Sequence, residues 1–121
     1  MPITLNHTIV PAAHNERAAR FFATVMGLPY EGPDRHFAPV RVNESLTLDY
    51  LSVPEPLGTH LAFDVDPATF DAVLTRLREA AVPYGNDPST PDNGRTDHPL
   101  AARGLYFTDD SGNLYELMSP A

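Results

Sequence analysis

Two histidines and one glutamate of this chain have the types and positions that could hold a metal ion. His7 and His60 each lie in a strand-like segment before a predicted helix, and Glu116 lies in the last strand-like segment. Two neutral imidazoles and one carboxylate bind a first-row divalent ion on one side and leave positions open to water or substrate. Because an open position distinguishes a catalytic metal site from a closed structural one, these residues are candidate ligands of a catalytic metal.

Each candidate also has a plainer interpretation. A lone histidine in a strand is more often a hydrogen-bonded core or surface residue. A glutamate near the end of a chain is usually solvated. The metal interpretation therefore depends on whether the fold gives the three residues related positions.

An internal repeat gives the two histidines matching positions. His7 and His60 are 53 positions apart, and the Pro-Tyr pairs at residues 29–30 and 83–84 are 54 apart. Each histidine precedes a segment with apolar residues at helical spacing: positions 18, 21, 22, 25 and 26, then 70, 73, 74, 77 and 81. This agreement across a strand, a helix and a turn indicates a duplication.

Capping residues delimit the two predicted helices. Asn15 is the expected N-cap of the first helix, and Gly27 lies where that helix should stop. Asp66 followed by Pro67 is a good start for the second helix.

The remainder of each half predicts strands joined by turns. Residues 37–42 and 45–51 flank the turn Asn43-Glu44, and residues 104–108 and 113–119 flank the polar turn 109–112. A short second strand is expected near each Pro-Tyr pair. The prediction is a single α+β domain of two βαβββ modules with curled mixed sheets, spanning about residues 1–54 and 57–121.

The second half carries an extra loop. His7 and Asp49 are 42 positions apart, whereas His60 and Glu116 are 56 apart. A polar run of 14 residues at 86–99, without hydrophobic periodicity, accounts for the difference. Its removal sets Asp49 opposite Glu116. We expect the loop to lie over one end of the site.

Two residues at the end of this loop are weaker candidates. His98 could enter the site as an acid, and Arg103 could bind an anion. The alternative is a solvated loop. His14 and His36 are expected at the surface.

Strand alternation places the ligand candidates on one face of each sheet. His60 and Ala62 share a face, as do Leu114, Glu116 and Met118, away from the predicted helix. The repeat gives His7 the same orientation as His60. The three ligands would converge if the sheets curl into a cup, whose face residues suggest a partly apolar small-molecule ligand.

Composition excludes several functions. The 121 residues fit one domain, and the absence of cysteine excludes disulfides and thiolate metal sites. The net charge of -8 and the lack of basic runs argue against a nucleic-acid-binding function. There is no apolar run long enough for a membrane span and no secretory signal, so we expect a cytoplasmic protein.

Nearly the whole chain resembles the vicinal oxygen chelate superfamily, which includes glyoxalase I, extradiol dioxygenases, fosfomycin-resistance enzymes and bleomycin-resistance proteins. The matching segments are residues 5–7, 25–28 and 59–63 and, most specifically, 105–116, with an aromatic strand, an Asp-x-x-Gly turn and the terminal Glu116. The resemblance implies one divalent metal at His7, His60 and Glu116, with Fe, Mn, Ni, Co and Zn all open. It also implies a homodimer, with His7 of one chain facing His60 and Glu116 of the other.

The superfamily's subgroups assign further residues differently. By resemblance to glyoxalases, Asp49 is a possible fourth ligand or an outer partner through water, while ring-cleaving dioxygenases use two His and one Glu. Tyr106 lies where fosfomycin-resistance enzymes place a site tyrosine, and the alternative is a core aromatic. Ile9 stands where those enzymes have Thr, which argues against that activity.

The resulting expectation is a divalent-metal-dependent enzyme. It would chelate a small oxygenated substrate through neighbouring oxygens, with ring-cleaving dioxygenase-like or glyoxalase-like chemistry. The alternative is a non-catalytic, bleomycin-resistance-like protein that binds an antibiotic, which the net charge of -8 permits.

Overall fold

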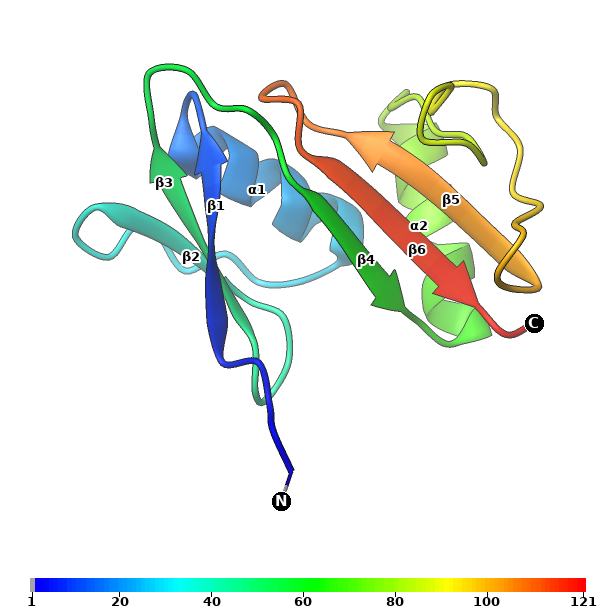
Figure 1. Ribbon diagram of the computed structural model, residues 1–121, viewed down its shortest axis with the longest axis horizontal. Coiled ribbons are helices and arrows are strands. Elements are labelled where there is room, and N and C mark those ends of the chain that lie inside the picture. The colour runs from blue at the N-terminus through cyan, green and yellow to red at the C-terminus, as the bar shows by residue number, and fades with distance from the viewer. Residues whose placement is uncertain (1) are drawn as a thin grey trace.

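The computed structural model describes residues 2–121, which form two similar modules side by side (Figure 1). The first module consists of β1 (His7–Ala12), α1 (Asn15–Met26), β2 (Phe37–Arg41) and β3 (Thr47–Ser52). The second consists of β4 (His60–Asp64), α2 (Pro67–Glu79), β5 (Arg103–Thr108) and β6 (Leu114–Ser119). The predicted α+β fold of two repeated modules is confirmed.

Each module contains a three-stranded mixed sheet, with strand orders β1-β3-β2 and β4-β6-β5. The central strands, β3 and β6, are parallel to β1 and β4 and antiparallel to β2 and β5. The short second strand that the sequence suggested is reduced to isolated bridges, Asp34 with Phe37 and Gly85 with Tyr106. Pro33 and Pro83 lie in these segments, and proline has no N–H to extend a strand ladder.

The strand register establishes the equivalence of the two modules. His7 pairs with Thr47 in the parallel β1–β3 ladder, and His60 pairs with Leu114 in the parallel β4–β6 ladder. Two residues further along the central strands lie Asp49 and Glu116. They therefore occupy the same position of the repeat, as the length of the loop insertion predicted.

The helix boundaries follow local capping chemistry. The backbone N–H of Thr69 donates to Asp66 Oδ1 over 2.8 Å, and Gly27 ends α1 in the left-handed conformation with φ of 73°. The first helix differs from prediction, because His14 is its N-cap and Asn15 is its first residue. The Asn15 amide instead donates to the carbonyl oxygen of His36, which ties the helix to the segment before β2.

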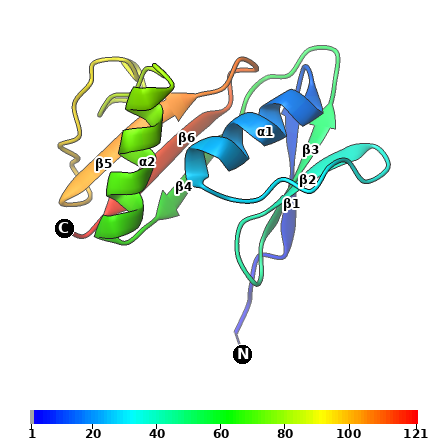
Figure 2. The same ribbon diagram turned by 180° about the vertical axis from the view of Figure 1, so that it is seen from behind.

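Both helices cover the same side of the molecule (Figure 2), and the opposite faces of the two sheets are open in Figure 1. The core lies between sheets and helices. Phe22 of α1 reaches both modules, with ring centroids 6.3 Å from Tyr50 and 5.1 Å from Tyr115. No helix in the described part of the chain is long and apolar enough to cross a membrane.

Candidate functional site

Glu116 is a buried carboxylate on the open face of the second sheet. It belongs to the central strand β6, pairs with Tyr106 of β5 on one side and with Ala62 of β4 on the other, and is 5% exposed. Burial of a charged carboxylate is unfavourable unless its oxygens accept hydrogen bonds or bind a cation. The groups around its two oxygens therefore determine whether the carboxylate stays charged and which atoms it can bind.

His60 supplies the contact to one oxygen. Its Nε2 lies 2.8 Å from Glu116 Oε1, and half of the imidazole side chain is exposed to solvent. The parallel β4–β6 register makes this contact possible, because His60 and Ala62 alternate faces with the residues packed under α2. The prediction that His60 and Ala62 share a face of the strand is therefore confirmed.

His98 supplies the contact to the other oxygen. Its Nε2 lies 2.7 Å from Glu116 Oε2, and its side chain is 0% exposed. The loop that contains it runs beside β5 and is fastened there by the Gly104 N–H, which donates to the Thr96 carbonyl over 2.8 Å. The sequence predicts that the loop lies at one end of the site, with His98 a weaker candidate than His60.

These contacts keep the Glu116 carboxylate ionised. Burial by itself raises the pKa of Glu116, but hydrogen bonds from His60, His98 and Tyr106 outweigh burial, and the pKa lies below its usual value. A negative charge is therefore held at this point of the sheet throughout the neutral range.

Tyr106 lies on the same face as Glu116. Its ring stacks on the His98 ring with centroids 5.9 Å apart and an interplanar angle of 23°. Burial, and then the nearby Glu116 carboxylate, raise the pKa of Tyr106 to about 12. Its hydroxyl therefore stays protonated at neutral pH.

Arg103 does not enter the site, contrary to one of the expectations from sequence. Its guanidinium Nη1 lies 2.7 Å from Asp71 Oδ1, and the group stacks over Phe70 at 4.4 Å from the ring centroid. Both partners belong to α2 on the helical side of the sheet. The reason is strand alternation, since Arg103 and Tyr106 face opposite sides of β5.

His7 and Asp49 lie together on the other sheet. Both line a hollow of about 330 Å³. His7 is exposed, and its Nδ1 lies 2.8 Å from the side-chain oxygen of Asn6. In residues 2–121 of a single chain, no three histidine or acidic side chains are arranged so that they could hold a metal ion. The sheets therefore do not bring His7 to His60 and Glu116 within one chain.

The donor set nevertheless fits a divalent ion in part. An imidazole nitrogen of His60 and a carboxylate oxygen of Glu116 adjoin each other at a solvent-accessible edge. Nitrogen and oxygen donors of this kind suit Fe, Mn, Co, Ni or Zn. Two protein ligands leave the site incomplete within one chain.

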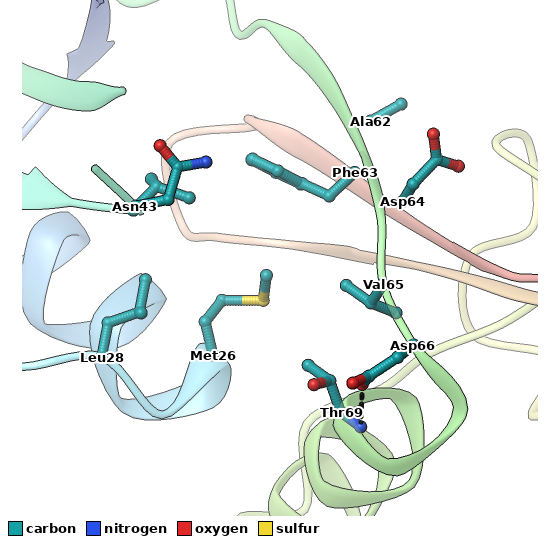
Figure 3. Close-up of a pocket in the computed structure, with 10 residues that line it drawn as sticks. Met26, Leu28, Asn43, Ala62, Phe63, Asp64, Val65, Asp66 and Thr69 are labelled. Carbon is teal, nitrogen blue, oxygen red and sulfur yellow. Dashed lines mark hydrogen bonds between the residues drawn. The ribbon is translucent and has the colours of Figure 1, made fainter. Parts of the chain in front are cut away.

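A larger hollow of about 510 Å³ lies where the two modules meet, and Figure 3 shows its lining residues. Met26 and Leu28 from the end of α1 face Phe63 and Val65 across it. No histidine lines this hollow. Asp64 and Asp66 also line it, but Glu116, His60 and His98 are not among its lining residues, so this hollow is distinct from the Glu116 site.

Comparison with known proteins identifies the family. No sequence-family model matches the chain. The solved structure of oxidase ChaP-H2 is 36% identical, with a TM-score of 0.89 over 98% of this chain and 94% of that chain. Oxidase ChaP-H1 is 31% identical, with a TM-score of 0.86 over 98% and 96% of the two chains.

More distant structures share the fold. A glyoxalase/dioxygenase from Nostoc punctiforme is 23% identical, with a TM-score of 0.69 over 96% of this chain and 90% of that chain. A fosfomycin resistance protein and an antibiotic-binding protein have the same fold at lower identity. Together with the two repeated modules, these relatives show that the chain belongs to the vicinal oxygen chelate superfamily.

Proposed function

We propose that this chain is a divalent-metal-dependent enzyme that oxidises a small oxygenated substrate with dioxygen. The observation that carries the proposal is the buried Glu116 carboxylate, whose Oε1 adjoins the Nε2 of His60 over 2.8 Å. A buried, ionised carboxylate beside an accessible imidazole is typical of a functional site. The oxidase names of the two relatives above 30% identity favour oxidation over glyoxalase-type isomerisation.

The third metal ligand in this proposal is His7 of a second copy of the chain. His7 is exposed on β1, an edge strand, and Ile9 on the same face is 48% exposed. Leu5, close by in sequence, is 62% exposed. Large apolar side chains exposed around a potential ligand support coverage by another protein surface. A homodimer would join the open face of one first module to the open face of the other chain's second module.

The chain's own residues have distinct roles in this site. Glu116 and the two imidazoles would hold the ion, which when bound chelates neighbouring substrate oxygens and stabilises the charge that develops there. The hydroxyl of Tyr106 donates its hydrogen bond to Glu116, so it would be left to accept a hydrogen bond from a substrate hydroxyl. Leu114 and Met118, on the same face of β6, contact apolar parts of the substrate.

Metal analysis and oxygen consumption test this proposal. Metal-free protein is titrated with Fe²⁺, Mn²⁺, Co²⁺, Ni²⁺ and Zn²⁺ under anaerobic conditions, and oxygen uptake is then measured with a panel of catechols. We expect tight binding of one equivalent per chain and metal-dependent uptake, both lost in Glu116→Gln. Glu79→Gln, an exposed change at the end of α2, is the matched control.

The other outcomes identify the alternatives. Metal-dependent conversion of a hemithioacetal without oxygen uptake would indicate a glyoxalase-type enzyme. A protein that binds none of the five ions above pH 7 would contradict both enzyme assignments and favour an antibiotic-binding role.

A further inference from the structure

We infer that His98 is a positioning residue, which the loop of residues 86–99 holds against Glu116 so that only Oε1 of the carboxylate is presented to a metal ion. The inference rests on the proposed metal site and assigns a purpose to the loop that distinguishes the second module from the first. It is carried by the contacts of His98 and by the way that its ring is enclosed.

The hydrogen bonds of His98 define its tautomer. The backbone N–H of Leu100 donates to His98 Nδ1 over 3.0 Å, so Nδ1 carries no proton. The proton of the neutral ring is therefore on Nε2, 2.7 Å from Glu116 Oε2. His98 donates a hydrogen bond to the carboxylate through this atom.

The enclosure of His98 argues against it as a metal ligand. Its side chain is 0% exposed, and its Nδ1 lone pair is occupied by the backbone of its own loop. His98 is thus unlike His60, whose side chain is half exposed and whose second ring nitrogen has no hydrogen bond among the described residues. The two histidines contact opposite oxygens of one carboxylate, and only the one at Oε1 has access to solvent.

The His98 ring packs against strand β5. Gly104 of β5 lies under the ring, and a Cβ at residue 104 would overlap the imidazole atoms. Tyr106 stacks on the ring at 5.9 Å. The Gly104–Thr96 backbone hydrogen bond fixes the approach of the loop. Enclosure on these sides leaves the ring with a single orientation, which directs Nε2 at Glu116.

A hydrogen bond to the far oxygen affects metal binding through geometry. A carboxylate that rotates freely loses conformational entropy when it binds an ion, whereas one held at Oε2 is already oriented. Loss of such an outer partner typically weakens metal affinity by about 10 to 100-fold. We expect His98→Ala to show a loss of this size.

Four variants test the inference. His98→Ala removes the donor, and His98→Gln keeps an N–H donor at a similar reach. Gly104→Ala leaves both Glu116 and His98 in the sequence but places a methyl group where the His98 ring packs. Asp97→Ala changes an exposed residue of the same loop, whose partner is Arg95, and is the matched control. For each variant, Co²⁺ affinity is measured by calorimetry, and Tm is measured without metal.

The expected pattern separates positioning from general loss of structure. His98→Ala and Gly104→Ala should bind Co²⁺ about 10 to 100-fold more weakly. The Co²⁺ affinities of His98→Gln and Asp97→Ala should remain within about threefold of that of the original protein. For His98→Gln, this should hold even if its Tm is lower. Unchanged affinity in His98→Ala, or an equal loss in His98→Gln, would overturn the inference.

A second measurement distinguishes this inference from the proposed function. In metal-free protein labelled with ¹⁵N, the imidazole nitrogen shifts of His98 should report a neutral ring protonated at Nε2. If the protein binds no metal but shows this tautomer, the proposed function fails and the hydrogen-bonding role stands. A ring protonated at Nδ1 overturns the role irrespective of metal binding.

Discussion

The hydroxyl groups of Tyr50 and Tyr115 lie 2.7 Å apart in the core, and this contact joins the central strand of one module to that of the other. The Tyr115 hydroxyl also donates to Asp109 Oδ2 over 2.9 Å. Because that bond uses the Tyr115 proton, the Tyr50 hydroxyl is the donor to Tyr115. Burial raises the pKa of both phenols well above neutrality, so this chain of hydrogen bonds keeps its protons.

Asn113 extends the same network to β1 and to Thr59, the residue before β4. Its side-chain amide donates to the Pro11 carbonyl over 3.0 Å and to Asp109 Oδ2 over 2.9 Å. Its Oδ1 accepts from the backbone N–H of Thr59 over 3.0 Å. Among the described residues, no buried side-chain nitrogen or oxygen lacks a partner. The network therefore connects the modules through satisfied polar groups.

The direction of donation predicts unequal effects of removing the two hydroxyls. Tyr115→Phe leaves the Tyr50 donor and one oxygen of the buried Asp109 with fewer partners, so it should lower the free energy of unfolding by about 1–3 kcal/mol. Tyr50→Phe leaves the Tyr115–Asp109 bond in place, so we expect a smaller loss of about 1 kcal/mol. Urea denaturation measures both, and a larger loss for Tyr50→Phe would contradict this direction.

The position of Asp49 predicts that it acts as an outer partner of the metal and not as a direct ligand. Asp49 is the repeat counterpart of Glu116, but it lies in the hollow with His7, and aspartate is shorter than glutamate. If it supports the metal as an outer partner, Asp49→Ala should weaken Co²⁺ affinity by about 10 to 100-fold. A calorimetric loss below about threefold would exclude Asp49 from the ligands and their partners. Asp92→Ala, in the exposed part of the loop, provides the comparison for loss of one charge.

A site shared between two copies predicts complementation of inactive variants. His7→Ala and Glu116→Ala chains should each bind metal weakly, because each homodimer lacks a ligand at both sites. A mixed dimer has one intact site, so unfolding and refolding an equal mixture should restore about one quarter of the original sites. Metal content after gel filtration measures this recovery. No recovery despite mixed dimers would show that His7 does not act across the interface.

The N-cap of α2 predicts a pH-dependent contribution to stability. The hydrogen bond from Thr69 lowers the pKa of Asp66 below its unfolded value of about 3.9. A carboxyl group with a lowered pKa in the folded state stabilises above the unfolded pKa, and this effect is lost as pH falls through the folded pKa. Asp66→Ala should therefore lower Tm at pH 7 and lose most of this difference near pH 2.

Asp66→Asn is the control for this prediction, since asparagine caps a helix without a titrating group. Its Tm difference from the original protein should change with pH by the same amount as that of Asp66→Ala, so the Tm difference between the two variants, which reports the uncharged cap, should stay constant. Scanning calorimetry at several pH values checks both. A constant Tm difference for Asp66→Ala across this range would mean that the Asp66 charge does not contribute.

Several features were predictable because they depend on neighbouring residues. Helix α2 begins at Pro67 after Asp66, and Gly27 ends α1, because caps are set by residues one or two positions away. The shared face of His60 and Glu116 follows from strand alternation. The equivalence of Asp49 and Glu116 follows from the repeat once the loop insertion is removed.

Other features depend on contacts that no local pattern records. The loop of residues 86–99 has no periodicity, and its path depends on Thr96 reaching the N–H of Gly104. The missing side chain at Gly104 was a signal that could have been recognised, since glycine within a strand often marks a close approach of another group. The tautomer of His98 follows only from its position between Leu100 and Glu116.

The sequence by itself determined the repeated modules, the end of α1, the start of α2 and the strand faces that carry His60 and Glu116, because periodicity, capping and alternation act over a few residues. Only the tertiary structure decided that His98 contacts Glu116, that Arg103 faces α2, and that His7 lies apart from Glu116 in one chain. The physical reason is that these outcomes depend on how a loop packs on a strand and how two sheets orient, through contacts between residues far apart in the chain.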